Sequence, residues 1–307
     1  MIKGISLFTV TMLMFFQSYA QSDSASSIAR DSLAKDSIFV IQSQDEEKNV
    51  SHEKKSVYTL KPGVDIPIVA IGTGWSLYAF TKIYNKPRAD TLQIQSLNSK
   101  DVNSFDRWAM HPYLQSLDKA SYIPFYAAMP LPILYFLADK DMRSDFLKLT
   151  FLYWEAMSIT GLLGTNATYH VDRFRPYAYF HDSHGVLDNG APLGVAKNSF
   201  YAGHVQIVST PTFFLAKVFA DYHPDSKIKW VFYGVATVST AGMAYMRIQS
   251  GEHFPTDVII GAVTGALAGI LVPQFHKTKS TKAPSLSLMP YSTGEINGLT
   301  LSYKFKK

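Results

Sequence analysis

A short polar stretch, RIQSGEHFPTDV (residues 247–258), places residue types suited to nucleophilic chemistry at the start of an apolar run. Pro255 suits the first turn of a helix, so we expect His253 at a helix N-terminus and Asp257 one turn further on. A carboxylate there can accept a hydrogen bond from one imidazole nitrogen and leave the other as a nucleophile or base. Arg247 can hold an anion against that nitrogen. An ordinary capped helix with a surface ion pair is the alternative.

Two further stretches carry residues of matching chemistry. In DRFRPY, Arg173 and Arg175 follow an apolar block, and Pro176 ends the helix. In NSFYAGHVQIV, Gly203 and His204 open the next apolar block. Backbone N–H groups and the positive helix end then face outward beside an imidazole. Consecutive helices that run up and down would bring all of these residues to one end of a bundle.

Such a convergence predicts an oxyanion site with a nucleophile and a proton donor. Arg175 and Arg247 would bind a phosphate bidentately, and the Gly203 N–H would stabilise charge that develops in the transition state. His253 would attack phosphorus to give a phosphohistidine, and His204 would protonate the leaving alkoxide. This chemistry requires no metal or other cofactor, although vanadate could occupy the phosphate site.

The three stretches resemble the signature of the type 2 phosphatidic acid phosphatase superfamily, which also contains bacterial non-specific acid phosphatases and vanadium-dependent haloperoxidases. That signature has a lysine followed after six residues by Arg-Pro, then Pro-Ser-Gly-His, then Ser-Arg, five residues, His, three residues and Asp. The chain has TYHVDRFRP (residues 168–176), YAGH (residues 201–204) and MRIQSGEHFPTD (residues 246–257). The resemblance spans residues 66–275 in layout and implies a divergent bacterial member of the family.

The resemblance also identifies two missing donors. The family's motif lysine falls on Thr168, and its motif serine, which hydrogen-bonds phosphate in the family, falls on Ala202. By analogy with oxyanion donors, each loss would cost on the order of 3 kcal/mol, or roughly a hundredfold in rate. Arg173, Lys197 and His170 are nearby in the sequence and are candidates to replace the lost charge.

The composition of the 307-residue chain allows membrane helices or a large buried core, because 47% of its residues are hydrophobic and 17% are charged. The formal charge of +5 is spread along the chain, so nucleic-acid binding is not expected. The absence of cysteine excludes disulfides and thiolate catalysis. The remaining histidines are interpreted as solvated or substrate-contacting (His181 and His184) and as structural or exposed (His111, His223 and His276).

The N-terminus has the features of a secretory signal peptide. Lys3 precedes an apolar run, and Ser18 and Ala20 occupy the small-residue positions of a cleavage site before Gln21. We therefore expect residues 1–20 to be a signal peptide, with an uncleaved anchor helix as the alternative. Residues 21–56 are rich in Ser, Asp, Lys, Glu and Gln and are expected to form a disordered linker.

Six apolar blocks predict an all-α bundle of about six helices over residues 57–276, embedded in or associated with a membrane. Their lengths suit helices, and they lack strand-like alternation. A membrane span needs about 20 apolar residues; these blocks sit at or below that length, so a water-soluble bundle is the alternative. Gly261, Gly265 and Gly269 favour close approach of helix backbones. The blocks are residues 66–80, 121–138, 149–164, 205–219, 230–246 and 258–275.

The ends of the domain raise two further expectations. Residues 277–307 are expected to form a tail with a short β-hairpin around Gly294 and Gly298. A cleaved signal peptide would leave the mature N-terminus in the periplasm, so three crossings before Arg175 would put the candidate site in the cytoplasm. Five crossings, with the first block not spanning, or a soluble bundle would keep the site in the periplasm. Five crossings satisfy the positive-inside rule and are preferred.

The sequence therefore predicts a cell-envelope phosphatase that hydrolyses a phosphomonoester or pyrophosphate. The expected partners are the membrane and a phosphorylated lipid, such as phosphatidate, a polyprenyl diphosphate or lipid A, or else a small phosphomonoester. Two other functions stay open. One is a catalytically degenerate member that binds phosphorylated lipid or serves as a scaffold, because Thr168 and Ala202 lack the family's donors. The other is a vanadate-dependent haloperoxidase.

Overall fold

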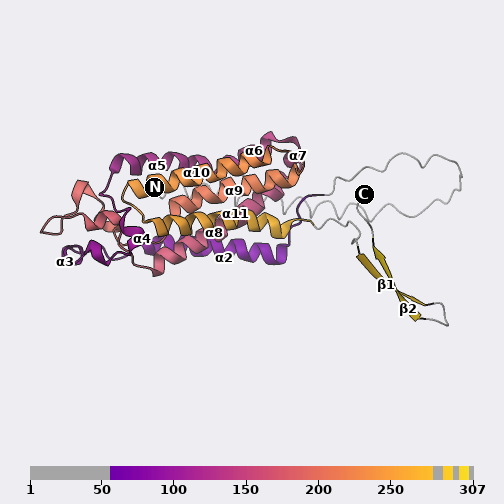
Figure 1. Ribbon diagram of the computed structural model, residues 1–307, viewed down its shortest axis with the longest axis horizontal. Helices are drawn as coiled ribbons and strands as arrows, with labels where there is room; N and C mark the ends of the chain where they lie inside the picture. The colour runs from indigo at the N-terminus through magenta and orange to yellow at the C-terminus, as the bar shows by residue number, and fades with distance from the viewer. Residues whose placement is uncertain (1–55, 279–285, 293–296, 304–307) are drawn as a thin grey trace, which may run out of the picture. The chain divides into compact units, whose positions relative to one another are not determined.

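The computed structural model describes residues 56–278, 286–292 and 297–303. Each predicted apolar block lies within a helix, except that the second is divided between two, so the predicted all-α bundle is confirmed. The predicted signal peptide and almost all of the predicted linker lie outside the described residues. The bundle helices (Figure 1) are α2 (Pro62–Tyr84), α5 (Gln115–Ala128), α6 (Leu131–Ala138), α8 (Phe146–His170), α9 (Gly203–Tyr222), α10 (Lys229–Gln249) and α11 (Pro255–His276).

Two long connections carry short helices at the end of the bundle drawn on the left in Figure 1. One joins α2 to α5 and the other joins α8 to α9. Pro176 follows the end of α8 and starts a short helical turn, as proline at a first helical position does. The short elements are α3 (Thr91–Gln95), η1 (Ser99–Asp101), α4 (Ser104–Arg107), η2 (Pro176–Tyr179), η3 (Asp188–Gly190) and η4 (Leu193–Val195); α7 (Lys140–Arg143) lies between α6 and α8.

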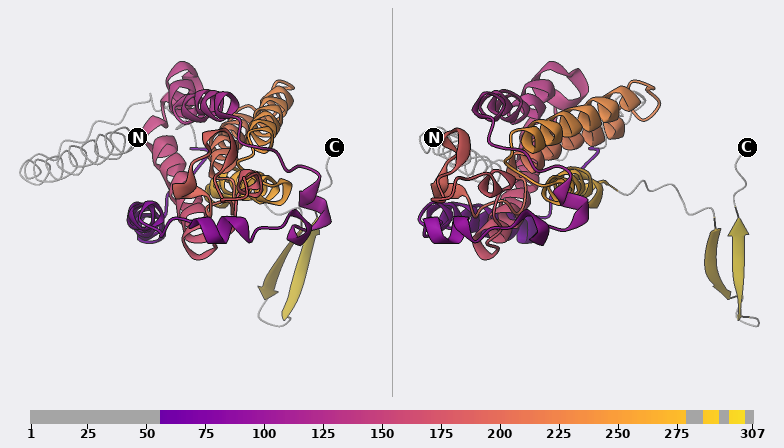
Figure 2. Two further views of the ribbon diagram at one scale, coloured as in Figure 1. Left: turned by 90° about the vertical axis from the view of Figure 1, so that its left-hand side faces the viewer. Right: turned by 60° about the vertical axis from the view of Figure 1, so that its left-hand side comes forward.

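Helix α9 is the central element of the bundle and contacts α5, α6, α8, α10 and α11 (Figure 2, left). Its closest neighbour is α11, which faces α9 with Gly261, Gly265 and Gly269. A Cβ atom at any of these glycines would lie 2.6 Å from a carbonyl oxygen of α9 or of its N-cap residue, Ala202. Only a hydrogen at this position allows the two backbones to pack so tightly, and the expected close approach is confirmed.

Within the part of the chain that the structure describes, three helical segments are long and apolar enough to cross a membrane: Pro62–Tyr84, Gln115–Ala138 and Pro255–His276. Large apolar side chains also point outward from the bundle, as a lipid-facing surface requires; examples are Ile71, Val238 and Val263. The first apolar block is among these three segments, whereas α8, α9 and α10 are not. The preferred five-crossing topology therefore gains no support here, and the number of crossings stays a prediction.

Two strands at the end of the chain, β1 (Leu286–Ser292) and β2 (Asn297–Tyr303), pair in antiparallel register. The residues that connect them, 293–296, lie outside the described part of the chain. The C-terminal hairpin as a folded unit of the protein stays a prediction.

Candidate functional site

The residues predicted to carry chemistry come together at the end of the bundle where α4 and η2 lie. Arg175 immediately precedes η2, and Gly203 and His204 form the first turn of α9. Arg247 lies in the last turn of α10, and His253 lies in the turn before α11. Both arginines are close enough to both histidines to affect their pKa values. The N–H of Gly203 is one of the helix-terminal donors that have no intrahelical acceptor.

Gly251 shapes the turn from which His253 projects. Its φ of 72° lies in the left-handed region, and a Cβ atom here would meet the carbonyl oxygen of Pro112 at 2.8 Å. Glycine therefore satisfies both the conformation and the space. The backbone N–H of Tyr177 donates to the Gly251 carbonyl at 3.0 Å and that of Leu114 to the Ser250 carbonyl at 3.2 Å, which fixes the turn from both sides.

The imidazole of His253 is buried and held in one orientation. Its Nδ1 lies 2.7 Å from the Ser199 carbonyl oxygen, and a carbonyl can only accept. Nδ1 therefore carries the proton, and Nε2 keeps a lone pair. Burial first, and then Arg175 and Arg247, hold the pKa of His253 well below its ordinary value. The ring is neutral and ready to act as a nucleophile.

Asp257 does not make the predicted hydrogen bond to His253. Its Oδ2 lies 3.9 Å from the ring Nδ1. That oxygen instead accepts the Ser199 hydroxyl at 2.6 Å and the Phe254 backbone N–H at 3.0 Å. The prediction was wrong because the Ser199 carbonyl already accepts the imidazole proton. Asp257 therefore acts through Ser199, a residue that lies 54 positions from His253 in the chain and that motif spacing could not identify.

A second carboxylate, Asp106, supports Asp257 from α4. Arg173 joins the two, with one guanidinium nitrogen 2.6 Å from Asp106 and another paired with Asp257. Thr256 donates its backbone N–H and its hydroxyl to Asp106 at 2.9 and 2.7 Å. Burial alone would raise the pKa of Asp106, but the hydrogen bonds from Thr256, Asn103 and Arg173 hold it below its ordinary value. The sequence had suggested no chemistry for this short helix.

Glu252 lies between the two predicted phosphate-binding arginines. Its side chain is buried, and its Oε2 pairs with Arg175 and accepts from Arg247 at 2.8 Å. Arg247 also donates to Asp118 at 2.6 Å and to the Ser121 hydroxyl at 2.9 Å. The sequence alone assigned Glu252 no role. Its position next to the candidate nucleophile His253 is the one feature of the sequence that could have indicated it.

Three buried nitrogens of this site make no hydrogen bond to any described residue. They are Nε of Arg175, Nε of Arg247 and Nε2 of His204. The His204 ring packs against Phe125 and Tyr122, with ring centroids 4.6 and 4.8 Å away. Burial, Arg247 and Arg175 hold the pKa of His204 well below its ordinary value. Buried polar atoms without a partner are costly.

The two positions that depart from the family signature contribute no donor to this site. The Thr168 hydroxyl donates to the Gly164 carbonyl of its own helix at 3.0 Å. Ala202 is fully buried at the N-cap of α9. Lys86, at the end of α2, approaches Thr168 from outside, with Nζ 2.9 Å from the Thr168 carbonyl and 2.5 Å from Asp172. Eighty-two positions separate Lys86 from Thr168, so sequence proximity could not suggest it.

Of the three residues predicted to replace the lost charge, two are engaged elsewhere. Arg173 is bound by Asp106 and Asp257 as described above. His170 is exposed and stacks on Trp75, with ring centroids 6.5 Å apart. Both suggestions are wrong because nearness in sequence does not determine where a side chain points. Lys197 is half-buried and lies two residues before Ser199 in the same segment. Its role in replacing the lost charge stays a prediction.

Comparison with known proteins assigns a family to the part of the chain that carries these residues. Residues 149–281 match the model of the PAP2 superfamily. Comparison with curated proteins and with solved structures found no match. The matched region begins in α8, extends past the end of α11 and contains Arg175, His204, Arg247 and His253. Residues 149–281 are therefore similar to the PAP2 superfamily, and this match is consistent with a type 2 phosphatidic acid phosphatase family member.

Proposed function

We propose that this protein is a phosphatase that transfers a phosphoryl group from a phosphomonoester or pyrophosphate to His253 and then to water. The family is one of phosphatase-type hydrolases, and the unpartnered nitrogens of Arg175, Arg247 and His204 carry the proposal. Burial lowers the pKa of His253, and Arg175, Arg247 and His204 are all close enough to lower it further. The Nδ1 proton of His253 is already bound by the Ser199 carbonyl. A tetrahedral oxyanion is the ligand that a group of buried guanidinium and imidazole nitrogens fits best.

The reaction has two steps. The Nε2 lone pair of His253 attacks phosphorus, the bond from phosphorus to the leaving oxygen breaks, and His204 gives its proton to that oxygen. Water then attacks the phosphohistidine and returns a proton to His204, and the P–N bond breaks to release phosphate. His204 must be protonated in the first step. Together with burial, the two arginines lower the pKa of His204, and the negative charge of a bound phosphate dianion would offset their effect. Substrate binding would therefore favour the protonated form of His204.

Asp257, Ser199 and Asp106 position the nucleophile and do not touch the substrate in this scheme. The carboxylate of Asp257 fixes the Ser199 hydroxyl at 2.6 Å, and the Ser199 carbonyl stabilises the positive charge that grows on the imidazole during attack. Asp106 and Arg173 hold Asp257 in turn.

We further propose a phosphorylated lipid as substrate, with the site facing the periplasm of an exported protein. Phe125 and Tyr122 form an aromatic wall against the proton donor His204. Both belong to the segment Gln115–Ala138, which is apolar enough to span a membrane. An apolar leaving group is therefore favoured on the side where His204 delivers its proton. Phosphatidate, a polyprenyl diphosphate and lipid A all carry apolar chains on the part of the molecule that leaves.

A binding-only function is the second candidate, because two donors of the family signature are missing at Thr168 and Ala202. Glu252 and Asp118 also balance the charge of the two arginines, which weakens the site's attraction for a dianion. The experiment that decides measures phosphate release by the full chain in detergent micelles, from a small phosphomonoester and a panel of phosphorylated lipids. His253→Ala is compared with His223→Ala, a change at a half-buried histidine that follows the far end of α9, away from the site.

Release that His253→Ala abolishes and His223→Ala leaves intact would support the phosphatase. Lipid binding without release on any substrate would support the binding-only function. Restoring the family donors with Thr168→Lys and Ala202→Ser would then be expected to give a large gain. Bromide oxidation that depends on added vanadate would instead support the haloperoxidase.

A further inference from the structure

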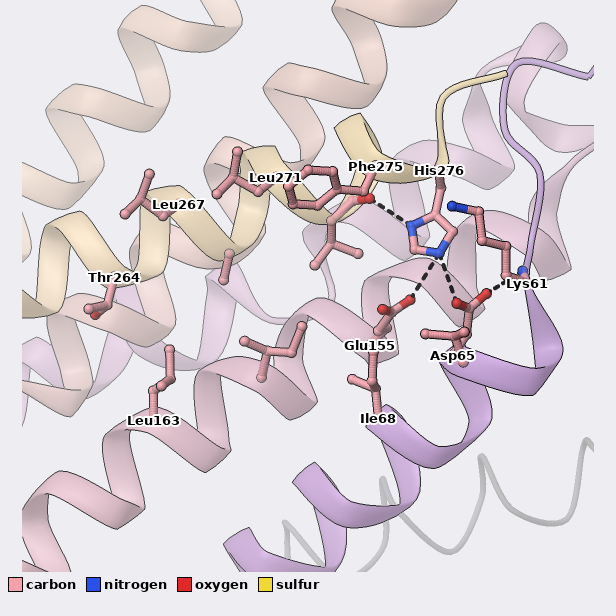
Figure 3. Close-up of a pocket in the computed structure, with 14 residues that line it drawn as sticks. Lys61, Asp65, Ile68, Glu155, Leu163, Thr264, Leu267, Leu271, Phe275 and His276 are labelled. Carbon is pink, nitrogen blue, oxygen red and sulfur yellow. Dashed lines mark hydrogen bonds and ion pairs between the residues drawn. The ribbon is translucent and has the colours of Figure 1, made fainter. Parts of the chain in front are cut away.

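A buried trio of metal-ligand types lies at the opposite end of the bundle from His253. Asp65 of α2, Glu155 of α8 and His276 of α11 are 1%, 3% and 7% exposed, and their side chains point toward one another (Figure 3). Helix α11 separates the two ends by roughly 30 Å, from its 22 residues at about 1.5 Å each. The phosphatase mechanism makes no use of these residues.

The surroundings of His276 fix its lone pair toward the two carboxylates. Nδ1 lies 2.8 Å from the Val272 carbonyl oxygen and must donate to it. Nε2 then faces Asp65 Oδ1 at 3.0 Å and Glu155 Oε2 at 3.6 Å. The other oxygen of Asp65 accepts the backbone N–H of Lys61 at 2.6 Å. The side chains of His276 and Asp65 are therefore each oriented by a hydrogen bond to a backbone group, as the side chains of metal ligands commonly are.

This arrangement is electrostatically incomplete. Glu155 Oε2 and His276 Nε2 make no hydrogen bond to any described residue although both are buried. A proton on Nε2 could be donated to Asp65, but one negative charge and an unpartnered oxygen would remain on Glu155. Burying such a charge is strongly unfavourable. Lys61 lines the same cavity, but its side chain is exposed. A divalent cation would neutralise both carboxylates and use the lone pair of the imidazole.

The spacing of the three atoms fits a small tetrahedral ion. All three lie within 4.8 Å of one another, and the two measured separations are 3.0 and 3.6 Å. Zinc bonds of about 2.0–2.1 Å in a tetrahedron separate the ligand atoms by roughly 3.3 Å. Magnesium and calcium prefer oxygen-only ligands, whereas an imidazole with carboxylates suits zinc or manganese.

We propose that Asp65, Glu155 and His276 bind one divalent transition-metal ion, with Zn²⁺ as the best match. An adjoining cavity of about 420 Å³ leaves room for water as the fourth ligand and for exchange of the ion. The site would link the start of α2 to the end of α11. The same junction is closed by the Thr59 N–H to the His276 carbonyl and by the Thr278 N–H to the Val57 carbonyl, both at 2.9 Å. The ion therefore stabilises the fold.

The test uses the full chain in detergent micelles, stripped with EDTA and then given Zn²⁺, Mn²⁺ or Mg²⁺. Bound metal is measured by mass spectrometry of the eluted protein, and stability by thermal unfolding. We expect one equivalent of Zn²⁺ per chain, a higher melting temperature with Zn²⁺, a smaller rise with Mn²⁺ and none with Mg²⁺. Glu155→Gln keeps the side-chain shape and should weaken Zn²⁺ binding by on the order of 100-fold or more, since one ligand is lost.

Asp141→Asn is the matched control. Asp141 belongs to a second, half-buried trio with Asp139 and His223, and its substitution should leave Zn²⁺ binding unchanged. Zinc retained equally by Glu155→Gln would overturn the proposal, as would wild-type protein that binds no equivalent of Zn²⁺ and melts at the same temperature with and without EDTA. If Glu155→Gln fails to fold, Asp65→Asn replaces it, and the wild-type melting comparison still decides.

Discussion

Two histidines at opposite ends of the bundle are held in the same way but face opposite charges. His253 and His276 each direct Nδ1 to a backbone carbonyl, at 2.7 and 2.8 Å, and leave Nε2 free. Arg175 and Arg247 lie near the first ring, whereas two carboxylates face the second. The tautomer is thus common to both, and in our proposals the neighbouring charges decide whether the lone pair attacks phosphorus or binds a metal ion.

The largest expected effect is the loss of catalysis when the histidine at the arginine-rich end, His253, is removed. His253→Ala should reduce turnover by at least about 10⁴-fold, because it removes the nucleophile. It should leave vanadate binding measurable, because the arginines remain. Single-turnover phosphate release and vanadate titration of the same preparation test both parts. Turnover within tenfold of the wild type would remove His253 from the mechanism.

A matched pair of glutamate substitutions, one at each end of the bundle, should change the free energy of unfolding by different amounts. Glu252→Gln removes the partner of two buried arginines and should cost about 3–5 kcal/mol of unfolding free energy. Glu155→Gln, measured in EDTA, removes a charge that Asp65 repels and should cost little or stabilise the protein. Denaturant unfolding in micelles gives both values. Equal losses would mean that the two carboxylates sit in equivalent surroundings and would contradict the contrast.

A smaller effect is expected where Asp257 acts through Ser199. Ser199→Ala keeps the carbonyl that holds His253 but loses the hydroxyl bound to Asp257. We expect kcat to fall by about 10–100-fold, as for other supporting hydrogen bonds, with KM nearly unchanged. Ser199→Thr should restore most of the rate. A change confined to KM would instead place Ser199 in substrate binding.

The smallest effect concerns acid stability. Burial first, and then the arginines, lower the pKa values of His253 and His204. The unfolded chain takes up protons at these residues below about pH 6.5, whereas the folded chain does not. Stability should therefore fall as pH drops below that value, by up to about 1.4 kcal/mol per pH unit for each histidine. Unfolding measured from about pH 7 to pH 5 should show a shallower slope for His204→Ala; an unchanged slope would contradict the pKa shift.

The sequence predicted the helices well because apolar blocks, prolines and the repeated glycines are local signals. It also placed Arg175, His204, Arg247 and His253 together, because alternating helix directions bring those positions to one end. What could not be predicted are partners brought in from distant segments. The Ser199 carbonyl replaces Asp257 at the imidazole, and Asp106 comes from a helix that shows no motif.

The trio at the far end was missed for the same reason. Asp65, Glu155 and His276 lie on three different helices and are separated by 90 and 121 positions, so their spacing in the sequence does not resemble a metal-ligand motif. His276 was interpreted as structural or exposed, and the structure places it in the buried interior.

The measurement that tests the central claim most directly is a rapid quench of the full chain during turnover of a ³²P-labelled phosphorylated lipid, under alkaline conditions that preserve phosphohistidine. The label is then located by peptide mass spectrometry. The account predicts labelled phosphate on Nε2 of His253, and no label in His253→Ala. Phosphate release with no label on the protein, or with label on His204, would contradict it.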